Sequence, residues 1–70
     1  MERKMRFGEN LGKELKSNRI SQMELAKKLN TTQATISRWV GGLNEPDFTT
    51  LFLLCDIFDC SPNELLGWDD

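Results

Sequence analysis

Apolar residues in the first part of the chain recur at the spacing of an α-helix. Phe7, Leu11 and Leu15 lie four residues apart, so they form one apolar stripe on a helix that we expect from about Arg6 to Ser17. Two glycines within this span each lower helix stability by about 1 kcal/mol relative to alanine. This helix must therefore gain its stability by packing against the rest of the protein.

Two short helices joined by a tight turn are predicted next. Ser21 and Glu24 have the spacing of a capping box, in which each side chain accepts a hydrogen bond from the other residue's backbone. Asn30 tolerates the left-handed conformation and is expected to end this helix. The following helix is expected to begin after the N-cap Thr32 and to end at Gly41–Gly42. So short a turn predicts a steep crossing, which is a helix-turn-helix arrangement.

The last third of the chain predicts two more helices. Asp47 is expected to cap a helix that ends near residue 58. Ser61, Pro62 and Glu64 specify the start of a short helix that stops at Gly67. The expected core stripe of the longer helix consists of Phe48, Leu51, Leu54, Cys55 and Phe58.

Some apolar residues of this region fall outside the expected core stripe. Leu53 and Ile57 point roughly opposite it and, with Leu66 and Trp68, form a candidate face for a dimer or a partner. The alternative is that Leu53 packs under the C-terminal residues of its own chain. We favour the intermolecular interpretation.

The composition argues against an enzyme or a metalloprotein. The chain has no histidine and no tyrosine, which excludes catalytic arrangements and zinc sites that depend on histidine. Cys55 and Cys60 lack the Cys-x-x-Cys spacing and are expected to be free thiols, buried or half-buried. Because no glycine-rich phosphate loop is present either, we expect no catalysis, metal or cofactor.

The length allows one small domain, residues 1–70, without room for a separate sensor domain. The longest apolar run, Leu51–Cys55, has five residues, whereas a membrane span needs about twenty. We expect a cytoplasmic protein that contacts no membrane and binds no small-molecule ligand by itself.

Charge is distributed unevenly along the chain. Residues 1–46 carry nine basic and five acidic side chains, a net charge of +4, whereas residues 47–70 carry six acidic side chains and no basic one. This asymmetry indicates one face for a polyanion and another face for a different contact.

One extended motif resembles the Cro/phage-repressor (XRE-type) helix-turn-helix family. Its residues are Gln22-x-Glu24-Leu25-Ala26-x-x-Leu29-Asn30-Thr31-Thr32-Gln33-x-Thr35-Ile36-Ser37-x-Trp39-x-x-Gly42-x-x-x-Pro46. The similarity covers about residues 6–67 and continues through Leu51, Leu54, Phe58, Ser61 and Leu65-Leu66-Gly67. The resemblance implies an all-α, compact five-helix lambda-repressor-like DNA-binding domain, with its helix-turn-helix at about residues 21–40 and its third helix in the major groove.

The chain departs from the family pattern at three places. Asn30 replaces the family's turn glycine. Leu15 and Val40 replace an arginine and a glutamate that often form an ion pair, and we predict that these apolar side chains contact each other. Leu43 and Asn44 stand where the family carries a basic residue after the third helix.

Major-groove reading requires short or planar polar side chains on an exposed helix face. Gln33 has the geometry to pair with adenine, and Arg38 can reach guanine or a phosphate. The alternative is that such residues are ordinary solvated surface. Trp39 is interpreted as a packing residue rather than one that stacks on bases. The residues expected to read bases are Gln33, Ala34, Thr35, Ser37 and Arg38.

Phosphate contacts are expected from Gln22, Thr32 and Asn44. Together these features predict a sequence-specific DNA-binding transcriptional regulator. We expect a repressor that occupies a near-palindromic operator as a homodimer. The alternative is a protein-interaction module, antitoxin-like or an accessory regulator, that binds DNA weakly.

Overall fold

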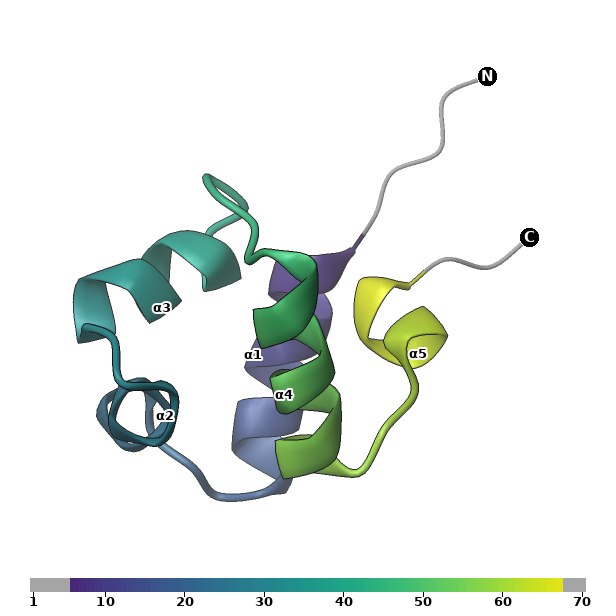
Figure 1. Ribbon diagram of the computed structural model, residues 1–70, viewed down its shortest axis with the longest axis horizontal. Coiled ribbons are helices and arrows are strands. Elements are labelled where there is room, and N and C mark those ends of the chain that lie inside the picture. The colour runs from purple at the N-terminus through teal and green to yellow at the C-terminus, as the bar shows by residue number, and fades with distance from the viewer. Residues whose placement is uncertain (1–5, 68–70) are drawn as a thin grey trace.

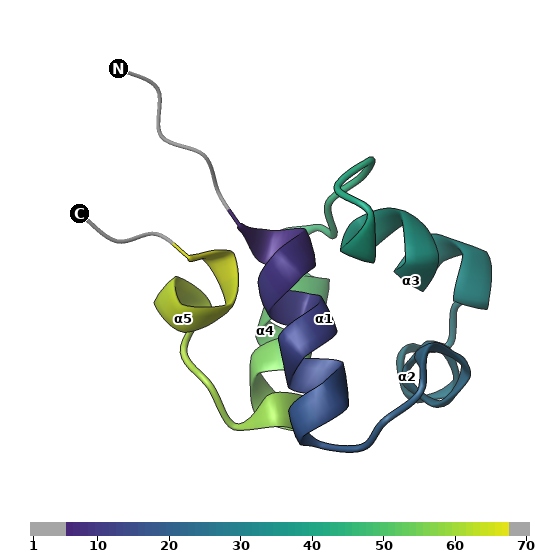
Figure 2. The same cartoon turned by 180° about the vertical axis from the view of Figure 1, so that it is seen from behind.

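The computed structural model describes residues 6–67, and this range contains five helices and no strand. Their bounds are α1 Phe7–Ser17, α2 Gln22–Leu29, α3 Gln33–Val40, α4 Phe48–Phe58 and α5 Pro62–Leu66. Figure 1 and the reverse view in Figure 2 show α2 and α3 on one side of α1 and α5 on the other. The expected all-α, five-helix architecture is confirmed.

Side-chain caps define the starts of four helices. Ser21, Thr32, Asp47 and Ser61 each accept a hydrogen bond from the backbone N–H three residues later. The Ser21 cap is reciprocal, because the Glu24 carboxylate accepts from the Ser21 N–H at 3.0 Å. The Ser21 N–H and hydroxyl hold the pKa of Glu24 below its ordinary value. Every predicted N-cap is therefore confirmed.

Residues in the left-handed conformation end several helices. Asn30 has φ 56°, which confirms the turn expected from its side chain. Arg19 and Asp59 also adopt the left-handed conformation, with φ 55° and 53°, and neither was predicted from the sequence. After Arg19, the Ile20 N–H donates to the Leu15 carbonyl at 3.0 Å and closes the end of α1.

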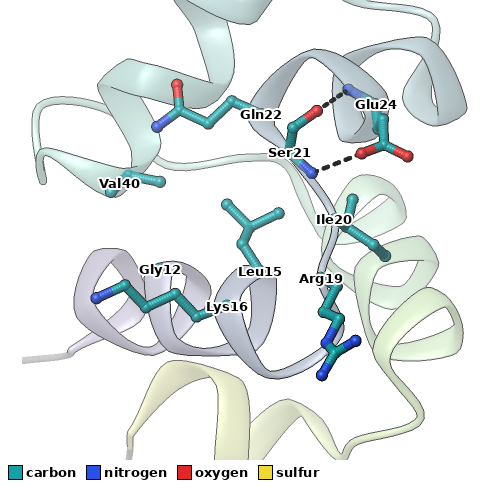
Figure 3. Close-up of a pocket in the computed structure, with 9 residues that line it drawn as sticks. All are labelled: Gly12, Leu15, Lys16, Arg19, Ile20, Ser21, Gln22, Glu24 and Val40. Carbon is teal, nitrogen blue, oxygen red and sulfur yellow. Dashed lines mark hydrogen bonds between the residues drawn. The ribbon is translucent and has the colours of Figure 1, made fainter.

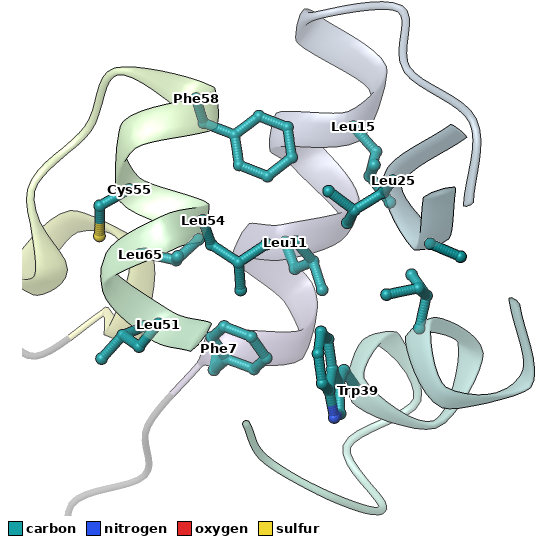
Figure 4. Close-up of a cluster of buried hydrophobic side chains, with 12 residues drawn as sticks. Phe7, Leu11, Leu15, Leu25, Trp39, Leu51, Leu54, Cys55, Phe58 and Leu65 are labelled. Atoms are coloured by element: carbon teal, nitrogen blue, oxygen red, sulfur yellow. The ribbon is translucent and has the colours of Figure 1, made fainter. Parts of the chain in front are cut away.

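One core joins all five helices (Figure 4). The rings of Phe7 and Trp39 pack edge to face, with their centroids 6.4 Å apart. Trp39 is 7% exposed, which confirms it as a packing residue. The buried set is Phe7, Leu11, Leu15, Leu25, Ala26, Ile36, Trp39, Leu51, Leu54, Cys55, Phe58 and Leu65.

One backbone and two side-chain hydrogen bonds tie the start of α1 to α5. The Arg6 N–H donates to the Leu66 carbonyl at 2.9 Å. The Asn10 side-chain amide donates to the Glu64 and Leu65 carbonyls, each at 3.2 Å. These bonds satisfy carbonyls that the short α5 cannot pair internally.

Two expectations for α4 are wrong. Phe48 is 80% exposed rather than part of the core, because it occupies the first turn of α4, where the loop after α3 leaves its ring uncovered. Ile57 is half-buried and packs against the core rather than pointing away from it, whereas Leu53 is exposed as expected.

Cys55 is buried and Cys60 half-buried, and both are free thiols as expected. Burial raises the pKa of Cys60 to about 11 and also raises the pKa of Cys55. Within residues 6–67, no helix has the length and apolar character to cross a membrane. In the same range no cluster of three or more potential metal-binding side chains occurs.

Candidate functional site

The turn between α2 and α3 sets the two helices at a steep angle. Asn30 reverses the chain in the left-handed conformation, and the Thr31 N–H donates to the Ala26 carbonyl at 2.9 Å. Thr32 then caps α3. Figure 1 looks nearly along the axis of α2 but across α3. The expected helix-turn-helix arrangement is therefore present.

The inner side of α3 is fixed by the core. Ile36 is fully buried, and Trp39 packs on Phe7 of α1. A Cβ atom at Gly8 of α1 would lie 2.6 Å from the Trp39 carbonyl oxygen, closer than real Cβ contacts, so α3 approaches the α1 backbone directly. A helix held in this way presents its outer side chains at fixed positions.

The outer side of α3 carries most of the predicted base-reading residues. Gln33 and Ser37 are exposed and lie one turn apart, and Ala34 and Arg38 form a neighbouring exposed row. Thr35 is half-buried, and its hydroxyl lies 3.0 Å from the Thr32 hydroxyl. The structure therefore brings four predicted residues together on one exposed face and engages Thr35 partly in the cap.

The three predicted phosphate residues have different surroundings. Gln22 is half-buried at the first position of α2 and lines a surface hollow (Figure 3). Thr32 is exposed, but its hydroxyl already accepts from the Thr35 N–H at 3.2 Å. Asn44 is exposed in the loop between α3 and α4.

The hollow beside Gln22 has a volume of about 500 Å³. Its walls include Leu15 and Val40, the residues that replace the family's ion pair. Val40 reaches to 3.7 Å from the position of a Cβ atom at Gly12, whereas direct contact between Leu15 and Val40 stays a prediction. This hollow was not predicted from the sequence, and the signal for it was the absence of a side chain at Gly12 on the lining of α1.

The predicted partner face is only partly exposed. Leu53 is 47% exposed, whereas Ile57 and Leu66 are half-buried, and Trp68 lies outside the described residues. Phe52 is 57% exposed one turn after Phe48 and was not among the residues predicted for this face. Its position four residues from another phenylalanine was the available signal.

Residues 10–70 match the family described as a Cro/C1-type helix-turn-helix DNA-binding domain. The chain is 34% identical over 64 residues to the HTH-type transcriptional regulator DicA of Escherichia coli K12, covering 91% of this chain and 47% of DicA. It is 37% identical over 60 residues to the uncharacterized HTH-type transcriptional regulator YqaE of Bacillus subtilis 168, covering 86% of this chain and 52% of YqaE. The chain thus spans about half the length of these curated relatives.

Solved structures show the same architecture. A transcriptional regulator from Listeria innocua has a TM-score of 0.91 and 28% identity, covering 97% of this chain and 64% of that chain. The P22 c2 repressor, solved in complex with a synthetic operator, has a TM-score of 0.81 and 32% identity, covering 90% of this chain and 96% of that chain. Both proteins therefore share the arrangement of the helices with this chain, although only about three in ten of their aligned residues are identical to it.

Proposed function

Because the chain belongs to the Cro/C1-type helix-turn-helix DNA-binding domain family, we propose that it binds double-stranded DNA sequence-specifically and represses transcription by occupying an operator. The observation that carries this proposal is the exposed face of α3, whose short polar side chains stand on a helix anchored through Ile36 and Trp39. In this role the chain works in the cytoplasm by binding, without catalysis or a cofactor.

Gln33 is the central base-reading residue of the proposal. It is exposed at the first position of α3, and its amide can both donate to and accept from one adenine edge. A bidentate pair of this kind contributes about 1–3 kcal/mol of discrimination between bases. Ala34 can lie against a thymine methyl group, Ser37 can contact either kind of base, and Arg38 can reach guanine or a phosphate.

Phosphate contacts fix the register of α3 in the groove. Gln22 at the start of α2 and Thr32 at the start of α3 stand at helix N-termini, where backbone dipoles favour an anion. Asn44, in the loop after α3, is the third proposed phosphate contact. Thr35 helps to hold the Thr32 cap at the start of α3, because its N–H donates to the Thr32 hydroxyl and the two hydroxyls lie 3.0 Å apart.

We propose a homodimer on a near-palindromic operator, formed through the face of Leu53, Ile57, Leu66 and Trp68. Leu53 is the most exposed of the three described members of this face. Residues 47–70 carry no cation, which keeps this half away from phosphates. A two-fold dimer would place the recognition helices about 34 Å apart, one turn of DNA.

Selection of bound duplexes from a randomised pool at physiological salt tests the proposal, since low salt favours non-specific binding. We expect an enriched near-palindrome with half-sites about 10 bp apart. An enriched single half-site would retain sequence-specific binding but refute the dimer. No enrichment would refute operator binding.

Matched variants then assign the effect to α3. Gln33→Ala is expected to weaken operator binding by about 5- to 150-fold, the equivalent of about 1–3 kcal/mol. Thr49→Ala, at an exposed position on α4, is the control and should bind as the unmodified protein does. Circular dichroism should show the same helix content for both variants.

A protein-interaction module is the second candidate function, and the exposed Phe48 and Phe52 on the acidic half favour it. Under this alternative, Leu53→Glu abolishes regulation in a reporter assay while Gln33→Ala leaves it intact. Loss of regulation in Gln33→Ala supports operator binding, and loss in both variants supports binding as the proposed dimer.

A further inference from the structure

The two cysteines of the chain occupy matched positions at the end of α4. Asp59 ends this helix in the left-handed conformation. The Cys55 carbonyl accepts hydrogen bonds from the Asp59 N–H and, at 3.0 Å, from the Cys60 N–H. These two bonds form a Schellman motif, in which the residue after the left-handed one commonly contacts the side chain five positions earlier. The motif therefore brings Cys60 to Cys55.

Two other helices end in the same way without thiols. The Ile20 N–H donates to the Leu15 carbonyl at 3.0 Å after α1, and the Thr31 N–H donates to the Ala26 carbonyl at 2.9 Å after α2. A left-handed residue precedes each donor, as it does at the end of α4. This helix end therefore forms with other side chains, and the fold alone does not require a pair of thiols.

The geometry of the motif suits a covalent bond between the two sulfur atoms. The Cα atoms of Cys55 and Cys60 are at most about 7 Å apart, because covalent bond lengths on either side of the 3.0 Å hydrogen bond allow no more. A disulfide spans Cα separations of about 4.4–6.8 Å. Figure 4 shows the Cys55 sulfur on the side of α4 along which the chain runs to α5.

The thiols also contact each other directly. Burial raises the pKa of both groups, and a hydrogen bond between them opposes this rise at Cys55 but adds to it at Cys60. The Cys60 S–H is therefore the donor and the Cys55 sulfur is the acceptor.

Access from solution differs between the two thiols. Cys60 is half-buried, whereas Cys55 is 7% exposed and belongs to the core. A small molecule therefore reaches the Cys60 sulfur first. Cys55 can react only with a group that Cys60 already carries.

We propose that Cys55 and Cys60 form a reversible redox site, which takes a small aliphatic disulfide as its substrate and closes a disulfide bond within the chain. This site is independent of the proposed DNA-binding function. Because thiols of cytosolic proteins are kept reduced, the bond would form when small disulfides accumulate.

The reaction has two exchange steps. The Cys60 thiolate attacks one sulfur of the small disulfide, and the other sulfur leaves as a thiolate that takes up the proton lost by Cys60. The Cys55 thiolate then attacks the Cys60 sulfur, and the second small thiolate leaves and takes up the proton lost by Cys55. The two protein thiols lose two electrons, which the small disulfide gains as it becomes two thiols.

The surroundings slow the first step without preventing it. Burial raises the pKa of Cys60 to about 11, and the neighbouring Cys55, Glu14 of α1 and Glu64 of α5 add to this rise. Asp56 and Glu64 likewise add to the effect of burial on the pKa of Cys55. At pH 7.5 a thiol of pKa about 11 is about 300-fold less ionised than a free cysteine, but its thiolate is about 13-fold more nucleophilic. Exchange at Cys60 is therefore only about 20-fold slower than at a free cysteine.

The bond should stabilise the folded protein. Since folding already holds the two cysteines in contact, the folded chain favours the disulfide, and the disulfide favours folding by the same factor. For a ring that closes over residues 55–60, we expect the Tm to rise by about 5–15 °C. The link joins the last turn of α4 to the segment before α5 and leaves the exposed face of α3 unchanged.

The first test treats the reduced full chain with oxidised glutathione at pH 7.5 in the absence of air, followed by acid quenching and mass spectrometry. We expect the unmodified protein to lose two hydrogen atoms and to keep no glutathione. Cys55→Ala should instead retain glutathione on Cys60, at a rate that rises about tenfold for each pH unit from 7 to 9, because only the thiolate reacts. Cys60→Ala, which keeps only the buried thiol, should react more slowly. Circular dichroism checks that both variants fold.

The second test needs no variant. In one fixed mixture of reduced and oxidised glutathione, the ratio of disulfide to dithiol should be about 10- to 50-fold higher in the folded protein than in concentrated urea. An equal or lower ratio in the folded protein would overturn the proposal, because folding would then not favour the bond. Disulfides between two chains, or lasting glutathione adducts on the unmodified protein, would also overturn it.

Discussion

The two halves of this domain use the same rules to form helices but present opposite surfaces. α2 and α3 expose polar and cationic side chains, among them Lys27, Lys28, Gln33, Ser37 and Arg38. α4 exposes Phe48, Phe52 and Leu53 in a segment without a single cation. Both halves begin their helices with side-chain caps and contribute to one core. Capping and core packing therefore establish the fold, whereas the residues left outside determine what each half can bind.

The contrast also shows how much a helical apolar pattern can mislead. α3 is buried along one side only, so its periodicity identifies the inner residues Ile36 and Trp39 correctly. α4 is apolar on most of its sides, so more than one of its faces has the apolar stripe expected of a buried face. Packing against α1 and α5 then decides which apolar residues become buried.

The largest expected effect distinguishes the buried from the exposed side of α4. Leu54→Ala should lower the free energy of unfolding by about 2–5 kcal/mol, because Leu54 is completely buried and its loss leaves a cavity. Phe48→Ala removes a larger ring but should cost less than about 0.5 kcal/mol, because that ring is 80% exposed. Urea unfolding followed by circular dichroism measures both.

These two variants also test whether the exposed face of α4 is covered in solution. A cost for Phe48→Ala that grows with protein concentration would mean that a second copy buries the ring. A concentration-independent cost similar to that of Leu54→Ala would contradict the exposure of Phe48 described above.

The next effect concerns how α3 is held on α1. Gly8→Ala should lower the free energy of unfolding by about 1–3 kcal/mol, because its Cβ would meet the Trp39 and Val40 carbonyl oxygens at 2.6 and 2.7 Å. Gly12→Ala should instead gain up to about 1 kcal/mol, since its Cβ lies at an ordinary 3.7 Å from Val40 and alanine favours the helix. Urea titrations of the two variants provide the comparison.

Opposite signs at two glycines of the same helix would show that close helix contact, rather than helix propensity, requires Gly8. If both substitutions stabilise the protein, α3 can withdraw from α1 at little cost. The position of the proposed recognition face would then be less firmly fixed than the structure indicates.

The sequence predicted features that depend on nearby residues. The capping box of Ser21 and Glu24, the turn at Asn30 and the proline-assisted start of α5 involve residues within four positions, so local chemistry determines them. The exposed position of Gln33 followed from the inward phase of Ile36 on one short helix. Most of the candidate base-reading face was therefore accessible from the sequence.

Features that depend on how the helices meet were not predicted. Phe48 satisfied the helical stripe, but no other segment covers the first turn of α4. Ile57 lay outside the stripe, yet it packs at the edge of the core. The hollow beside Gln22 requires Gly12 on one helix and Val40 at the end of another, which no local pattern specifies. Direct contact of Leu15 with Val40 and the roles of the site residues stay predictions.

The smallest expected effect compares the left-handed residues that end α2 and α4. Asp59→Gly should raise the free energy of unfolding by about 1 kcal/mol, because glycine adopts φ 53° without strain and removes a negative charge from a helix C-terminus. Asn30→Gly should gain less than about 0.5 kcal/mol, because asparagine tolerates its φ of 56° and carries no charge. Urea unfolding at low and high salt separates the causes, since salt should reduce the electrostatic part of the Asp59 gain. Equal gains in the free energy of unfolding for both variants at low salt would mean that relief of backbone strain accounts for the whole effect. The negative charge of Asp59 would then not destabilise the C-terminus of α4.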